Sequence, residues 1–123
     1  MVLVSKSSTL ASDLNRNLKV KIDSLKRLEK DYKYYQKELE EQKNTVQQFK
    51  NDSTKDEYDV KKQVEILDEN KTMIIDTVKR LTDSVNILTD FLDDNQDKTE
   101  SLEQYNEALE LVERLYSEYL DGN

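Results

Sequence analysis

The side chains that could take part in chemistry are amines, guanidinium groups, carboxylates and tyrosine hydroxyls, because the 123 residues include no cysteine and no histidine. These absences exclude disulfides, thiol nucleophiles, zinc sites built on Cys or His, and the usual acid–base group of neutral pH. The carboxylates lie along polar faces without the glycine-centred spacing of a calcium loop, and no glycine-rich phosphate loop occurs. We therefore expect a non-enzyme with no catalytic residue, no metal and no cofactor.

Lysine and arginine gather in the first part of the sequence. Residues 1–50 hold 11 of them against 7 acidic residues, a net charge of +4, whereas residues 51–123 hold 8 against 20, a net charge of −12. Either a basic first segment balances an acidic third one inside the molecule, or the basic residues form a docking face for an acidic protein. Tyr34 is expected to be exposed among these lysines, where an aromatic ring can anchor a protein interface.

An apolar stripe offers a second way to bind a partner. Ile66, Met73 and Ile87 recur at heptad spacing outside the main apolar seam of their segment. We expect this stripe to contact a neighbouring helix; the alternative is an exposed strip that binds a partner or a second copy. The candidate partner-binding residues of the whole chain are Lys26, Arg27, Lys30, Lys33, Tyr34, Lys37, Lys61, Lys62, Ile66 and Met73.

Long helices must position these side chains, because the sequence contains no proline and its one glycine is Gly122. The first helix is expected at about residues 9–50, after a flexible N-terminal extension at residues 1–8. Its apolar or near-apolar residues alternate in steps of three and four, the heptad pattern of packed helices. They are Ala11, Leu14, Leu18, Leu25, Leu28, Tyr32, Tyr35, Leu39, Val46 and Phe49, with Lys21 and Gln42 as interruptions.

Two polar breaks separate this helix from two more. The second helix is expected at about residues 56–93, beginning at acidic residues that suit a helix N-terminus. Its seam is Val60, Val64, Leu67, Ile74, Val78, Leu81, Val85, Leu88 and Leu92, interrupted by Lys71. The third helix is expected at about residues 98–120. Its seam is Leu102, Tyr105, Leu109, Val112, Tyr116 and Tyr119, with Ala108, Leu111 and Leu115 widening the face.

These patterns predict an all-α fold. Residues 9–121 are expected to form an antiparallel up-down-up three-helix bundle with coiled-coil-like packing. The apolar stripe favours three helices over a two-helix hairpin, because a middle helix between two neighbours needs a wider apolar face. No apolar run is long enough to cross a bilayer, and the acidic chain carries no nucleic-acid-binding motif. We therefore expect no membrane and no nucleic acid among its partners.

Particular strings resemble the tubulin-binding cofactor A family. They are LKVKIDSLKRLEKDY from Leu18, YDVKKQVEIL from Tyr58, MIIDTVKRL from Met73 and LEQYNEALELV in the third segment. The resemblance covers about 100 residues in the family's order. Two features depart from it: residues 1–17 extend beyond the family's usual start, and Ile75 stands where members often carry a proline.

The resemblance implies a tubulin-folding cofactor of the cytoplasm and microtubule cytoskeleton. Such a protein captures and stabilises β-tubulin after chaperonin release and passes it towards αβ-heterodimer assembly, with other tubulin-folding cofactors as further partners. Monomer and homodimer both remain open. The alternative functions are a structural or adaptor helical bundle and a tethering coiled coil, for which binding to free β-tubulin would be the discriminating observation.

Overall fold

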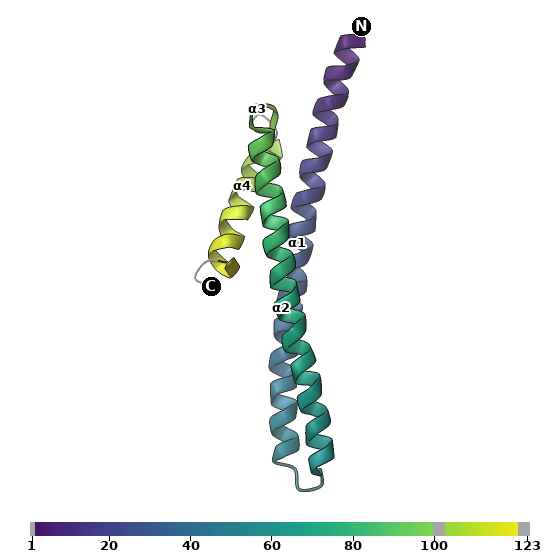
Figure 1. Ribbon diagram of the computed structural model, residues 1–123, viewed down its shortest axis with the longest axis vertical. Helices are drawn as coiled ribbons and strands as arrows, with labels where there is room; N and C mark the ends of the chain where they lie inside the picture. Colours follow the sequence, from purple (N-terminus) through teal and green to yellow (C-terminus); the bar gives the residue numbers. More distant parts are fainter. Residues whose placement is uncertain (1, 100–102, 121–123) are drawn as a thin grey trace. The chain divides into compact units, whose positions relative to one another are not determined.

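The computed structural model describes residues 2–99 and 103–120, with the side chains of 12–99 and 103–120. No strand occurs in these ranges, which confirms the all-α class. The first two helices are α1 (Val2–Lys50) and α2 (Glu57–Asp94) (Figure 1). α1 begins seven residues before the predicted start at Thr9, and no proline or glycine stands there to prevent it. The flexibility expected of residues 1–8 stays a prediction, and Met1 lies outside the described residues.

The third segment is divided in the structure. Its described elements are α3 (Gln96–Thr99), α4 (Glu103–Leu115) and the π-helical turn η1 (Tyr116–Leu120). Residues 100–102, which include the predicted seam residue Leu102, lie outside the described part, as does the predicted boundary at residue 121. The single helix expected at 98–120 and the up-down-up three-helix arrangement both stay predictions.

The start of α2 is fixed by its acidic residues, as the sequence predicts. The backbone N–H of Asp59 donates to the Asp56 carboxylate at 2.9 Å, and the Asp56 N–H donates to the Asp59 carboxylate at 3.2 Å. This is a reciprocal capping box with aspartate at both positions. α2 then runs unbroken through Ile75.

The chain divides into two compact units, to which α1 and α2 both contribute. The core unit is the described part of Met1–Arg27 and Arg80–Asn123, and the hairpin unit is Leu28–Lys79. In the core unit, apolar side chains of α1, α2 and α4 are buried at the predicted heptad positions and beside them. They are Leu14, Leu18, Ile22, Leu25, Leu81, Val85, Leu88, Leu92, Ala108, Leu111 and Leu115.

The inward face of α4 differs from the predicted seam. Leu109 is 37% exposed and Tyr116 is 55% exposed, so the prediction that both lie in the seam is wrong. The buried residues are instead Ala108, Leu111 and Leu115, which the sequence placed at the edge of the face. Ala108 is completely buried, and its small side chain lets a neighbouring element approach closely.

The hairpin unit joins the end of α1 to the start of α2 through residues 51–56, and the two helices run antiparallel within it (Figure 1). Its seam residues are those predicted, but most are half-buried. Val46 is the one apolar side chain of this unit that is fully buried among its described residues. Gln42, expected to interrupt the seam, bridges the helices: its Nε2 donates to the backbone oxygen and to Oε1 of Gln63, both at 2.9 Å.

Candidate protein-binding surfaces

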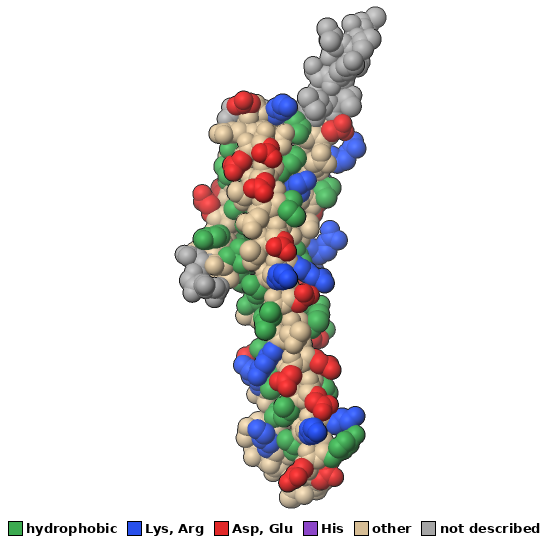
Figure 2. All heavy atoms as spheres, in the orientation of Figure 1, with side chains coloured by type: hydrophobic (Ala, Val, Ile, Leu, Met, Phe, Trp, Pro, Cys, Tyr) green, Lys and Arg blue, Asp and Glu red, His purple; other side chains and the backbone are tan. Residues whose placement is uncertain are grey.

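The apolar stripe on α2 is exposed. Ile66 and Met73 are each 41% exposed and Ile87 is 56% exposed, so the expectation that this stripe packs on a neighbouring helix is wrong. On the face that Figure 2 shows, hydrophobic side chains are visible among charged ones. The stripe therefore does not favour three helices over a two-helix hairpin. The exposure instead agrees with the alternative, an exposed apolar surface that binds a partner or a second copy.

Two of the predicted binding residues, Lys26 and Arg27, belong to the core unit. Lys26 Nζ lies 2.5 Å from the Glu107 carboxylate on α4, and this hydrogen bond, with the charge of Glu107, raises the pKa of Lys26. The contact agrees with the interpretation that a basic first segment balances an acidic third one. Arg27 is exposed and forms no ion pair within the described residues. Lys26 is therefore a poorer candidate for partner binding than the sequence suggested.

Three lysines form a basic face on α1 of the hairpin unit: Lys30, Lys33 and Lys37. Their spacing of three and four residues places them on one side of the helix, and all three are exposed. Lys33 Nζ lies 3.8 Å from the carboxylate of Glu29, whose side chain is nearly buried. Lys30 and Lys37 form no ion pair with any described residue. Their charges are the ones most available to an acidic partner.

Tyr34 lies beside the basic face and is 58% exposed, as predicted. Its ring meets that of Tyr35 edge to face, with the ring centroids 5.7 Å apart, which limits the orientations that it can take. A hydrogen bond to the Glu38 carboxylate raises the pKa of the Tyr34 hydroxyl. The ring is therefore held by two neighbours on its own helix while most of its surface is open to solvent.

The remaining predicted residues lie on α2 of the hairpin unit. Together with Tyr58, which is 64% exposed, Ile66 and Met73 form what we call the apolar strip. Lys62 stacks over the Tyr58 ring, with Nζ 5.5 Å from the ring centroid. Lys61 is exposed nearby.

Sequence reasoning missed two exposed apolar residues of α2. Tyr58 stands eight residues before Ile66, outside the seven-residue step of the stripe, so that pattern gave no signal for it. Ile75 is 70% exposed and lies away from the strip. Ile75 follows the seam residue Ile74 and fits no heptad position of the seam or of the stripe, so the sequence pattern gave no signal for its exposure.

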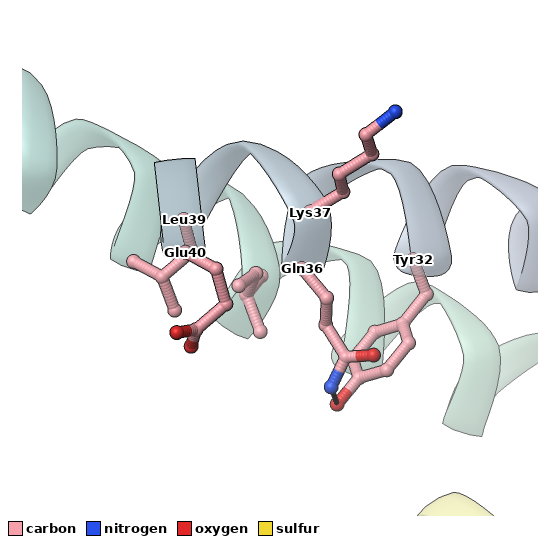
Figure 3. A pocket seen from close by; sticks show the side chains of 6 residues that line it. Tyr32, Gln36, Lys37, Leu39 and Glu40 are labelled. Carbon is pink, nitrogen blue, oxygen red and sulfur yellow. Dashed lines mark hydrogen bonds between the residues drawn. The ribbon is translucent and has the colours of Figure 1, made fainter. Parts of the chain in front are cut away.

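An open cavity of about 510 Å³ lies along the hairpin unit (Figure 3). Residues of α1 and Ile74 of α2 line it. Gln36 Nε2 donates to the Tyr32 hydroxyl at 2.9 Å on the same side of α1, whereas the Lys37 side chain points away from this pair (Figure 3). The cavity therefore does not bring the Lys37 charge and the tyrosine together.

The described residues include the candidate surfaces for binding another protein. They contain no cluster of three or more acidic side chains placed to hold a metal ion. In the same ranges, no helix combines the length and the apolar character that crossing a membrane would require. All the predicted binding residues except Lys26 and Arg27 fall in the hairpin unit. That unit can offer a partner two kinds of contact, charge on α1 and apolar surface on α2.

Comparisons with known proteins agree on one family. The family model described as tubulin binding cofactor A matches residues 13–112. A Dictyostelium discoideum protein named tubulin-specific chaperone A is 47% identical over 108 residues, which are 88% of this chain and 96% of that protein. A protein of the same name from Gallus gallus is 36% identical over 80% of this chain and 89% of its own length. The one from Homo sapiens is 36% identical over 76% of this chain and 84% of its own length. No solved structure matches significantly.

Proposed function

The chain belongs to the tubulin-binding cofactor A family, and we propose that it is a tubulin chaperone that captures β-tubulin after chaperonin release and passes it towards αβ-heterodimer assembly. The observation that carries this proposal is the extent of the similarity, since relatives named tubulin-specific chaperone A match over most of both chains. A binding role without catalysis agrees with the absence of cysteine and histidine from the sequence.

We propose further that the chain works in the cytoplasm beside the microtubule cytoskeleton, in the up-down-up bundle arrangement expected from the sequence. Other tubulin-folding cofactors are proposed as additional partners. A homodimer remains the alternative to a monomer, and sedimentation of the purified protein distinguishes the two.

The contact with tubulin is proposed to use both helices of the hairpin unit. The basic face of Lys30, Lys33 and Lys37 supplies charge that attracts an acidic protein over a distance of about one Debye length, roughly 8–10 Å at moderate salt. The apolar strip supplies surface that loses water on contact, which is the main favourable term in protein association. Tyr34 and Lys61 extend the two surfaces, and Arg27 adds exposed charge.

Charge reversal tests the role of the basic face. Lys30→Glu combined with Lys37→Glu changes two charges that have no intramolecular partner among the described residues. We expect the association rate with β-tubulin to fall by about tenfold at low salt and the salt dependence of that rate to weaken. The matched control is Lys79→Glu combined with Lys98→Glu, which makes the same change of charge at exposed lysines elsewhere. Equal rates for both double variants would refute the role of the basic face.

Polar substitution tests the apolar strip. Ile66→Ser combined with Met73→Ser removes two apolar side chains that are each 41% exposed. We expect the dissociation rate of the complex to rise, because apolar contacts formed at an interface act mainly on dissociation. The control is Ile87→Ser, in the same heptad position of α2 but in the core unit. An unchanged dissociation rate in the double variant, with unchanged helix content by circular dichroism, would remove the strip from the binding surface.

A further inference from the structure

The seam of the hairpin unit is built differently from the interior of the core unit. The described residues of the core unit include eleven buried apolar side chains, whereas the hairpin unit has one, Val46. The other seam residues of the hairpin, such as Leu39 on α1 and Leu67 on α2, keep part of their surface in water. Because the favourable free energy of burial scales with the apolar area removed from water, separating the two hairpin helices loses less than opening the core unit.

A polar pair joins the two helices within the seam of the hairpin unit. The Gln42 amide is part-buried and donates to two oxygens of Gln63. In an open hairpin, water can hydrate these same groups, so the net free energy lost with such hydrogen bonds is small. A polar residue at a heptad core position also fixes the register of two helices at a cost in stability. The amide pair thus defines how the helices align while weakening their association.

Two hollows lie on the surface of the hairpin unit, beside the seam. The cavity of about 510 Å³ lies beside Tyr32 and Ile74, and a second hollow of about 410 Å³ lies near the turn, beside Phe49 and Val60. Both hollows are open to solvent, so water reaches the seam without any rearrangement of the helices.

We propose that the hairpin unit opens and recloses separately while the core unit stays folded, and that the Gln42–Gln63 amide pair keeps this opening frequent. The segment that opens carries every predicted binding residue except Lys26 and Arg27. Elements that adapt to a partner are drawn from the least stable parts of a fold. The opening is a property of the free chain, so it goes beyond the tubulin chaperone function and does not depend on the identity of the partner.

Hydrogen exchange of the full chain tests the opening. Helices that lose their packing partner are marginal in water, so opening exposes backbone amides of both hairpin helices to exchange. We expect amides at residues 30–48 and 60–76 to exchange at least about tenfold faster than those at residues 14–25 and 83–92. The measurement is mass spectrometry of proteolytic fragments after labelling. Equal exchange in the two sets, or faster exchange in the second, would overturn the proposal.

Substitution tests the role of the amide pair. Gln42→Leu combined with Gln63→Leu replaces both partners by apolar groups, and we expect exchange in the hairpin unit to slow by about tenfold with the core unit unchanged. Gln42→Leu alone leaves the Gln63 side chain without its donor, and exchange in the hairpin is expected not to slow. The matched control is Gln48→Leu, at an exposed position of the same helix. A double variant that exchanges like the control, or that slows both units equally, contradicts the assignment.

Discussion

Truncating one leucine in each unit is expected to have unequal effects on stability. Leu81 and Leu67 both occupy heptad core positions of α2, so the sequence pattern treats them alike. Leu81 is completely buried in the core unit, whereas Leu67 is half-buried in the hairpin unit. Leu81→Ala removes fully buried methyl groups and leaves a closed cavity, which costs about 3–5 kcal/mol. Leu67→Ala leaves a space that water reaches, so the transfer term is partial and we expect about 1–2 kcal/mol.

Urea unfolding followed by circular dichroism measures this difference. With a urea dependence of about 1.5 kcal/mol per molar, Leu81→Ala is expected to lower the unfolding midpoint by about 2–3 M and Leu67→Ala by about 1 M. A loss of about 3–5 kcal/mol is a large part of the stability of an ordinary domain. Equal shifts for the two variants, or a larger one for Leu67→Ala, would refute the reasoning that the buried interior of the core unit holds the fold together.

Three further predictions concern particular hydrogen bonds. Asp56→Ala removes half of the capping box of α2 and is expected to cost about 0.5–2 kcal/mol in thermal unfolding. The Glu107 contact raises the pKa of Lys26, so its stabilisation is present below the ordinary lysine pKa of 10.5 and is lost as pH rises through the raised value; Glu107→Gln should remove this alkaline dependence of the unfolding midpoint. The Thr54 hydroxyl and N–H lower the pKa of Asp52, so any stabilisation from Asp52 is present above its ordinary pKa and is lost as pH falls through the lowered value; Thr54→Ala should raise that pKa in an NMR titration.

Each of these three has a result that would contradict it. An Asp56→Ala variant as stable as the parent would mean that the capping box contributes nothing to α2. The same alkaline unfolding curve with and without the Glu107 carboxylate would show that the Lys26 contact does not form in solution. An Asp52 pKa that stays low after Thr54→Ala would mean that the threonine hydroxyl is not its main cause.

The buried end of the α2 seam could be predicted from the sequence because the spacing of its apolar residues places them all on one side of a helix. Leu81, Val85, Leu88 and Leu92 recur at three and four residues, and a helix of 3.6 residues per turn places them on one side. All four are buried in the structure. The start of α2 could be predicted for a similar reason, since the capping oxygens and the N–H groups that they accept from are close in sequence.

The inward face of α4 could not be chosen in the same way. Leu109 and Tyr116 continue the heptad step. Leu111 and Leu115 form an equally regular stripe that adjoins the first one on the helix surface. Periodicity shows that a helix is amphipathic but does not decide between two adjoining apolar stripes. In the structure, the buried stripe is the one that contains Ala108, whose side chain is completely buried.

The partners of polar residues were the least predictable part of the candidate site. Lys26 and Glu107 stand 81 residues apart, and Gln42 and Gln63 stand 21 apart, so no local pattern joins either pair. The exposure of Ile66 and Met73 was also missed, because hydrophobicity states which side chains gain from burial and not whether a neighbour is present to bury them.

Size-exclusion chromatography of the purified chain with free β-tubulin and with assembled αβ-tubulin tests the proposed capture of β-tubulin. We expect a stable complex with β-tubulin and none with the heterodimer. An unrelated helical protein of similar charge serves as the control and should form neither complex. Failure to bind free β-tubulin, by a chain whose helix content is intact, would contradict the proposed function and favour a structural role for the helices.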